Sequence, residues 1–334
     1  MSVGRVAVLA GSIWARPYLL LPFPPLFWAV NLLIGRAFGA ELPPIGLTFW
    51  RWVVASLCVL PFAWRELRAK RREIQNHWRL IFAMSAAAFA GYPVLNYLAL
   101  QTTPAATAAV LNSTLPLMIP LIAWVVAGEN PPPQAFVGIA VSCGGVLWIV
   151  CRGVPAQLLE IGVSSGEILL LLAVAGYALY SVLLRRRPKQ LSDTALMAAM
   201  SVATVLIMLP LWIVDISLGR RFPIEIHTIV SLLFIGVFSS LLGAIVWNRC
   251  VATLGPTLTG ASFHLMAVYS SLLAILLLGE PVRAFHIVGI ALILLGLAAT
   301  FLPDLRLRQA IASSKAGGGE PRLSPSGKAG HERI

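Results

Sequence analysis

Amide and phenol groups recur inside long apolar stretches of this sequence. Tyr92 and Asn96 lie four residues apart, which places them on one face if residues 79–100 form a helix. Asn112 lies within the next apolar stretch. Such groups offer hydrogen bonds and aromatic surface, which suits the binding of a neutral molecule. The alternative is that they only form hydrogen bonds between helices.

The composition places these groups in a membrane. Of the 334 residues, 58% are hydrophobic and 11% are charged, whereas a soluble protein carries about a quarter charged residues. Because a span needs roughly 20 apolar residues, the sequence predicts an all-α membrane protein with ten transmembrane helices. They are expected at residues 18–38, 44–64, 79–100, 104–128, 133–151, 166–184, 194–214, 228–248, 257–279 and 283–302.

The distribution of basic residues predicts the orientation in the membrane. The net charge of +12 rests on 25 Lys and Arg residues, and most of them fall in alternate loops, above all in segments 65–79 and 185–189 and in the C-terminal tail. Cytoplasmic loops are enriched in this way. We therefore predict a multi-pass protein of the plasma (inner) membrane with both termini in the cytoplasm. Nucleic acid is not expected as a partner, because it would need one contiguous basic face.

The sequence also repeats itself. Gly128-Glu129 is followed by "VGIA" at 137–140, and the same pattern recurs as Gly279-Glu280 with "VGIA" at 288–291. We expect two repeats of five helices, residues 18–152 and 166–302, followed by a disordered cytoplasmic tail at 303–334. Five is an odd number, so the second repeat must enter the membrane inverted, as in many secondary transporters.

Two segments carry a motif that is known from a transporter family. The segment at 96–129, "NYLALQTTPAATAAVLNSTLPLMIPLIAWVVAGE", and the segment at 248–281, "NRCVATLGPTLTGASFHLMAVYSSLLAILLLGEP", resemble the EamA domain of the drug/metabolite transporter superfamily. The resemblance covers about residues 18–302. It implies a ten-helix bundle with a central cavity, mostly between the first, third, fourth, sixth, eighth and ninth helices.

The resemblance also selects candidate substrate-binding residues, because aromatic, amide and imidazole groups fall on the helices that would face this cavity. They would form a pocket for a small neutral, zwitterionic or aromatic metabolite. The candidates are Trp28, Asn31, Tyr92, Asn96, Asn112, Tyr177 and His264. The ninth helix has no Lys or Arg, unlike that of the plastid phosphate translocators, so an organic phosphate is not expected.

Prolines interrupt the predicted third and fourth spans. Pro93 removes a backbone hydrogen bond and frees the carbonyl of Phe89, and Pro116 and Pro120 act in the same way one turn apart. Such breaks are tolerated where a neighbour or a cavity takes up the freed carbonyl. We interpret the three prolines as hinge or gating positions, with a packing kink as the alternative. Because the matching residues of the second repeat are not proline, the first repeat is expected to be the more bent one.

Three charged residues lie close to the ends of spans. Glu129 and Glu280 close the fourth and ninth spans, and we assign them capping and hinge or gating roles, with a proton relay as the alternative. Arg51, in "FWRWVVA", lies near the outer end of the second span, so its side chain is expected to reach the interface. The family usually has a basic residue there, which favours a structural or gating role over an anion site.

The titratable groups argue against proton-driven transport. No Asp or Glu falls at mid-span depth, although proton-coupled carriers usually have a titratable group there. His264 is the mid-membrane group that titrates near neutral pH. It is interpreted either as a proton site or as a hydrogen-bonding histidine of the pocket. We predict facilitated or exchange transport without obligatory proton coupling.

The predicted function is a secondary transporter, an exporter or facilitator, that moves a small metabolite by alternating access. The sequence has no HExxH, GxSxG or paired intramembrane aspartates. No enzyme activity, cofactor or metal site is therefore predicted, and the four cysteines are assigned to packing. The alternatives are a non-transporting membrane receptor or scaffold, and a lipid or drug efflux protein. The oligomeric state stays open, with a homodimer among the alternatives.

Overall fold

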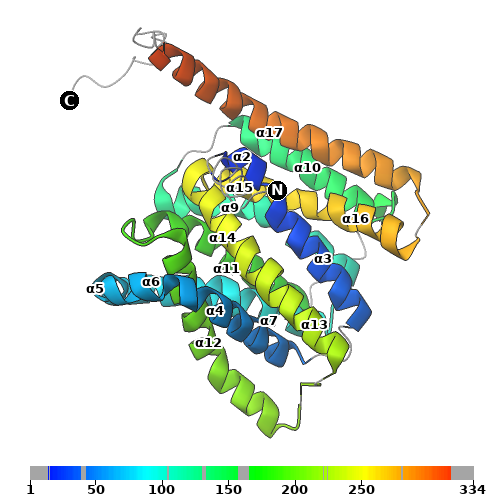
Figure 1. Ribbon diagram of the computed structural model, residues 1–334. Coiled ribbons are helices and arrows are strands. Elements are labelled where there is room, and N and C mark those ends of the chain that lie inside the picture. The colour runs from blue at the N-terminus through cyan, green and yellow to red at the C-terminus, as the bar shows by residue number, and fades with distance from the viewer. Residues whose placement is uncertain are drawn as a thin grey trace, which may run out of the picture.

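The chain folds into a bundle of helices. The computed structural model describes residues 14, 16–38, 43–103, 105–129, 133–156, 165–220, 222–223, 225–279 and 281–316, and these form only helices and loops (Figure 1). Within this part of the chain, ten helices are long and apolar enough to cross a membrane. The predicted all-α fold with ten transmembrane helices is confirmed.

The elements follow the order expected for two sets of five spans. The first set comprises α2 (Pro17–Leu20), α3 (Phe23–Phe38), α4 (Pro44–Ala69), α5 (Arg71–Asn76), α6 (Trp78–Met84), η1 (Ser85–Gly91), α7 (Tyr92–Ala99), α8 (Ala105–Asn112), α9 (Leu115–Ala127) and α10 (Pro133–Val150). The second set comprises α11 (Ser165–Leu183), η3 (Leu184–Arg186), α12 (Asp193–Ser217), α13 (Ile226–Phe234), η4 (Ile235–Leu242), α14 (Gly243–Leu254), α15 (Pro256–Ala261), η5 (Ser262–His264), α16 (Leu265–Leu278) and α17 (Ala284–Ala316).

The outer surface of the bundle is apolar. Large side chains such as Phe62, Ile226 and Leu276 are exposed to 83%, 77% and 76%. Exposed apolar patches of this extent are unfavourable in water and favourable against acyl chains. Together with the ten spans, they define a multi-pass membrane protein.

The third and eighth spans each contain a π-helical segment, η1 and η4, at matching places in the two repeats. A π-helical segment changes the backbone hydrogen-bond partners and commonly marks a functional site. In η1, the Phe89 carbonyl that Pro93 was predicted to free accepts a hydrogen bond of 2.9 Å from the Trp52 indole. In η4, the Ser239 carbonyl accepts one of 3.1 Å from the Trp28 indole. Each π segment therefore anchors an indole from another span.

The fourth and ninth spans are both interrupted. Helix α8 ends at Asn112 and α9 begins at Leu115, and α15 passes into α16 through the 3-10 turn η5. The break in the ninth span contains no proline. Both repeats are therefore interrupted at matching places, with prolines in the first and without them in the second. Both spans end on a left-handed glycine, Gly128 with φ 65° and Gly279 with φ 67°, which is a common helix cap.

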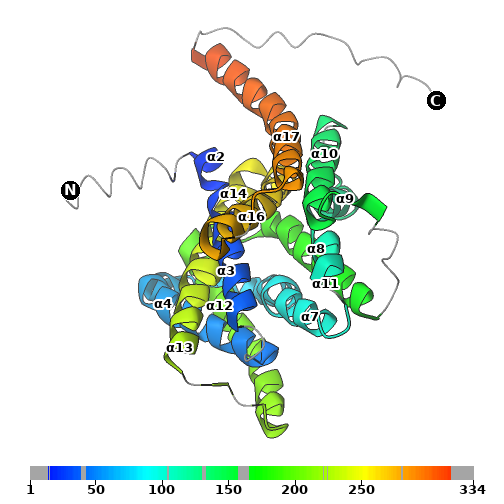
Figure 2. The same cartoon turned by 90° about the vertical axis from the view of Figure 1, so that its right-hand side faces the viewer.

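Helices α10 and α17 lie side by side at one edge of the bundle (Figures 1 and 2). A Cβ atom on Gly138 would lie 2.6 Å from the carbonyl oxygen of Gly296, and one on Gly145 would lie 2.6 Å from that of Gly289. The two pairs run in opposite directions along the two helices, so α10 and α17 are antiparallel. Since they are the fifth and the tenth span, the second repeat is inverted relative to the first.

Helix α17 continues beyond the predicted end of the last span. It runs to Ala316, so residues 303–316, which the sequence analysis assigned to a disordered tail, form helix instead. A proline at position 303 lies inside this helix. The rest of the predicted tail, residues 317–334, lies outside the described residues.

Candidate functional site

Aromatic side chains from both repeats meet between the helices. The ring of Trp28 in α3 lies 6.1 Å from Tyr177 in α11, 5.3 Å from Trp247 in α14 and 5.8 Å from Phe263 in η5. Tyr177 also lies 5.1 Å from Tyr92 in α7. These are the separations at which aromatic rings attract one another. We call these five residues the aromatic cluster.

Tyr92 links the aromatic cluster to a closed set of hydrogen bonds. The Tyr92 hydroxyl donates to Asn112 Oδ1 at 3.1 Å, Asn112 Nδ2 donates to Asn96 Oδ1 at 2.8 Å, and Asn96 Nδ2 donates to the Tyr92 carbonyl at 2.8 Å. We call these three residues the amide network. All three are partly exposed, as is Trp28, whereas Trp247 behind them is fully buried. The accessible side of the site is therefore both aromatic and hydrogen-bonding.

Five of the seven candidate substrate-binding residues lie together in this way. Trp28, Tyr92 and Tyr177 belong to the aromatic cluster, and Asn96 and Asn112 complete the amide network. Asn31 lies on α3 one turn from Trp28 and is partly exposed, and its side chain forms no hydrogen bond with a described residue. Sequence reasoning did not select Trp247 and Phe263, although both lie in the spans expected to face a cavity. The signal that was available was their aromatic character and, for Phe263, its place directly before the selected His264.

His264 belongs neither to the aromatic cluster nor to the amide network. It is 1% exposed, and both its ring nitrogens have partners. Nε2 lies 3.1 Å from the Ser113 carbonyl oxygen, and Nδ1 lies 2.6 Å from the Ser142 hydroxyl. A carbonyl only accepts, so Nε2 carries a hydrogen, and a neutral ring then accepts from Ser142. His264 thus connects the ninth span to the fourth and the fifth by hydrogen bonds. This geometry indicates a structural role.

Replacing His264 by alanine is expected to lower the free energy of unfolding by about 1–3 kcal/mol, because the Ser142 hydroxyl and the Ser113 carbonyl each lose one buried hydrogen bond. His264→Gln, whose amide offers a donor and an acceptor, should lose less. Thermal unfolding in detergent measures both. A His264→Ala protein that is as stable as the wild type, but whose transport no longer follows an imposed pH gradient, would instead make His264 a proton site.

Arg51 is buried, which corrects the expectation that its side chain reaches the interface. It is 9% exposed, and its Nε donates to Ser240 Oγ at 2.7 Å and its Nη2 to Ser239 Oγ at 3.3 Å. Both serines belong to the π segment η4 of the eighth span. The physical reason is that η4 places two hydroxyls beside α4, and a guanidinium needs several acceptors when it is buried.

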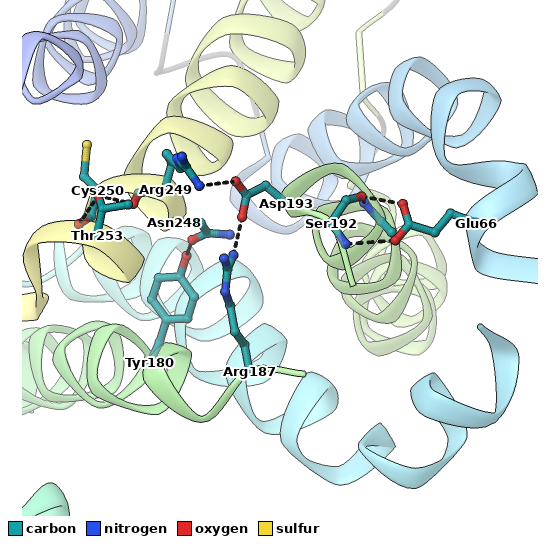
Figure 3. A network of polar contacts seen from close by, with 10 residues as sticks. Glu66, Tyr180, Arg187, Ser192, Asp193, Asn248, Arg249, Cys250 and Thr253 are labelled. Carbon is teal, nitrogen blue, oxygen red and sulfur yellow. Dashed lines mark hydrogen bonds and ion pairs between the residues drawn. The ribbon is translucent and has the colours of Figure 1, made fainter. Parts of the chain in front are cut away.

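Ion pairs connect several helix ends at one end of the bundle (Figure 3). Asp193, at the start of α12, pairs with Arg187 and, at 3.8 Å, with Arg249 of α14. Next to it, Glu66 of α4 accepts from the Ser192 backbone at 2.9 Å and from the Ser192 hydroxyl at 2.5 Å. We call these five residues the polar latch. It ties the second, seventh and eighth spans together.

Two further polar contacts lie at the end of the fourth span. Glu129 forms an ion pair of 3.1 Å with Arg185, and Arg186 donates to the Val126 carbonyl at 2.9 Å. Glu129 thus links the fourth span to the sixth, across the two repeats. Its counterpart Glu280 lies outside the described residues.

Asp193→Asn should lower the free energy of unfolding by about 1–3 kcal/mol, because two arginines lose their shared carboxylate in a mostly buried setting. The matched control is Glu73→Gln, whose partner His77 lies four residues away, directly after the end of α5. A half-exposed pair of this kind contributes less than about 0.5 kcal/mol. Thermal unfolding of both proteins measures the difference, and equal midpoints would show that the polar latch is not a structural tie.

The described residues contain no group of three or more His, Cys, Asp and Glu side chains that could hold a metal ion. The four cysteines are all free, and three of them are buried. The aromatic cluster, the amide network and Arg51 offer ring faces, amide donors and acceptors, and a buried guanidinium.

Ten apolar spans in two inverted repeats, with polar and aromatic groups gathered between them, define a membrane transporter. The chain belongs to the EamA-like transporter family, whose sequence pattern matches residues 16–151 and 164–302. The match to this family confirms the resemblance seen in the sequence and the two-repeat architecture.

Relatives of similar length are also described as transporters. The chain is 21% identical to the uncharacterized transporter YyaM of Bacillus subtilis, over 84% of this chain and 91% of the relative. It is 23% identical to an uncharacterized transporter of Archaeoglobus fulgidus, over 82% and 93%. A crystal structure with 19% sequence identity superposes with a TM-score of 0.69 over 88% of this chain and 99% of the other. That likeness supports the fold.

Proposed function

We propose that this protein is a secondary transporter that moves a small neutral, zwitterionic or aromatic metabolite across the plasma membrane by alternating access, as an exporter or facilitator. The observation that supports this best is the aromatic cluster, because Trp28 of the first repeat contacts Tyr177, Trp247 and Phe263 of the second. A substrate bound there touches both repeats. Its binding energy therefore depends on how the two repeats are placed relative to each other, which is the requirement for coupling binding to a change of access.

The amide network would fix the orientation of the substrate. Asn112 uses one amide hydrogen and accepts one hydrogen bond within the network, so part of its capacity for hydrogen bonding is left for a ligand. Aromatic faces beside it would hold the apolar body of the substrate. We propose Trp28, Asn31, Tyr92, Asn96, Asn112 and Tyr177 as substrate-binding residues, and we give His264 the structural role that its two hydrogen bonds support.

The hinges are proposed at the helix interruptions. Pro93 follows the π segment η1, and Pro116 and Pro120 follow the break between α8 and α9. A missing helical hydrogen bond lowers the cost of bending at these places. Glu129 and Glu280 are proposed as gating residues at the ends of the fourth and ninth spans. The ion pair of Glu129 with Arg185 supports a state in which this end of the bundle is closed.

Flux through proteoliposomes tests the proposed function. A panel of amino acids, nucleobases and sugar phosphates is offered to the reconstituted protein, with and without an imposed pH gradient. We expect uptake of a neutral or zwitterionic compound that does not follow the gradient, and a loss of at least tenfold in Asn112→Ala. Ser217→Ala is the control, because this exposed hydroxyl bonds only to its own helix at Val214.

Two results would contradict the proposal. Uptake that is the same with Asn112→Ala as with Ser217→Ala would remove the amide network from the site. Binding of a compound without any flux would favour a receptor over a transporter.

A further inference from the structure

Arg51 carries a buried charge for which the described chain provides no opposite charge. Its two hydrogen bonds go to the hydroxyls of Ser239 and Ser240, and it forms no ion pair with a described residue. Its Nη1 donates to no described group. The guanidinium therefore keeps donors that have no partner among the described residues.

Such an arrangement is unfavourable unless something else supplies the compensation. A buried ion that lacks a partner costs several kcal/mol, and neutral hydroxyls offset only part of this. Among the described residues, the other half-buried arginines do have a carboxylate partner: Arg187 and Arg249 share Asp193. Arg51 differs from them in lying inside the bundle, away from the polar latch.

The hydrogen bonds of Ser239 place the Arg51 guanidinium near the aromatic cluster. Ser239 accepts from Arg51 through its hydroxyl and from the Trp28 indole through its carbonyl, so one residue of η4 contacts both. A molecule whose body lies on the rings of Trp28 and Tyr177 can therefore bring a charged group to Arg51.

We propose that Arg51 binds the carboxylate of the transported molecule, and that the substrate is a small organic acid or zwitterion with an aromatic or branched apolar body. This inference rests on the proposed function and narrows its substrate class. A guanidinium suits a carboxylate because its planar fork donates two parallel hydrogen bonds to the two oxygens. A neutral nucleobase would leave the charge of Arg51 uncompensated. A phosphate group with two negative charges would find a single cation here, so the carboxylate fits the charge better.

Matched pairs of compounds test this on the unmodified protein. Binding to the purified protein is measured by thermal stabilisation for phenylalanine, leucine and 3-phenylpropionate, each against its own carboxamide. The members of a pair have nearly the same shape and differ in the carboxylate. We expect at least one carboxylate to bind at least tenfold more tightly than its amide, which corresponds to about 1.4 kcal/mol. Equal binding within every pair, or no binding of any carboxylate, would overturn the proposal.

Variants separate a role in binding from a role in folding. In Arg51→Gln, the affinities for the acid and for its amide are expected to differ by less than threefold. The affinity for the amide itself should change less than threefold from that of the wild type. Arg51→Lys keeps the charge but loses the fork, so it should keep part of the preference. If Arg51→Gln does not fold, Ser239→Ala, which removes one partner of the guanidinium, should reduce the preference several-fold. Equal losses for acid and amide in these variants would make Arg51 structural and overturn the proposal.

The same measurements keep this inference distinct from the proposed function. Stabilisation by sodium chloride that is lost in Arg51→Gln and matched by no panel carboxylate would make Arg51 an inorganic-anion site and overturn the carboxylate role. Transport of a neutral nucleobase in the flux assay, with no carboxylate bound, would overturn the inference while the transporter stands. Absence of flux for every compound would count against the proposed function itself.

Discussion

Gly145→Leu is expected to disrupt the packing of α10 against α17 and to lower the free energy of unfolding by at least about 3 kcal/mol. A Cβ atom at this position would lie 2.6 Å from the Gly289 carbonyl oxygen and 2.8 Å from the Ile293 backbone nitrogen. These neighbours are main-chain atoms, so the two helices must move apart to make room. In a membrane, helix association depends on close packing of small residues rather than on hydrophobic burial. The packing lost when the helices move apart is therefore not compensated by hydrophobic burial elsewhere.

The neighbouring residue provides the control. A Cβ atom on Gly144 would meet nothing within 4 Å, so Gly144→Leu adds the same side chain to the same helix on an open side. Its thermal midpoint in detergent should stay close to that of the wild type, and Gly145→Ala should fall between the two leucine variants. Equal midpoints for Gly144→Leu and Gly145→Leu would show that the close contact of α10 and α17 does not hold the repeats together.

Trp28→Ala is expected to reduce transport at least tenfold, an effect of the size expected for Asn112→Ala. The variant removes three ring contacts, with Tyr177, Trp247 and Phe263, each of which contributes about 0.5–1.5 kcal/mol. It also removes the donor to the Ser239 carbonyl. Flux of the compound selected by the proteoliposome panel measures the loss.

Trp28→Phe distinguishes the two contributions, because it keeps a ring in the aromatic cluster and loses only the indole N–H. We expect it to retain most of the affinity and to shift the position of η4, which appears as a smaller loss in flux. If Trp28→Ala transports as well as the wild type, the aromatic cluster is a packing core and the substrate binds elsewhere.

The number of spans, the repeat and the inversion were predictable because they rest on length and periodicity. An apolar stretch of about twenty residues has one plausible structure in a membrane, and an odd number of spans forces the inversion. That the carbonyl of Phe89 lacks its helical partner was also predictable, because Pro93 has no backbone N–H to donate to it. The donor, Trp52, was not, because it comes from another span.

The π segments, the polar latch and the position of Arg51 depend on tertiary packing. Residues 235–242 contain no proline and no other local signal for a π helix, yet η4 decides that Arg51 finds Ser239 and Ser240. Similarly, His264 stood out as a mid-span titratable group, but its partners Ser113 and Ser142 come from two other spans. In each case the residue type was visible in the sequence, and its partners were fixed only by how the helices pack.

The most direct test of alternating access is the accessibility of Asn31, which lies one turn from Trp28 and has no hydrogen-bond partner among the described residues. In a protein whose four native cysteines are replaced, Asn31→Cys is exposed to a membrane-impermeant thiol reagent in right-side-out and in inverted vesicles. Alternating access predicts labelling from both faces, slowed on both by the transported compound. Labelling from one face only, whether or not the compound is present, would contradict it.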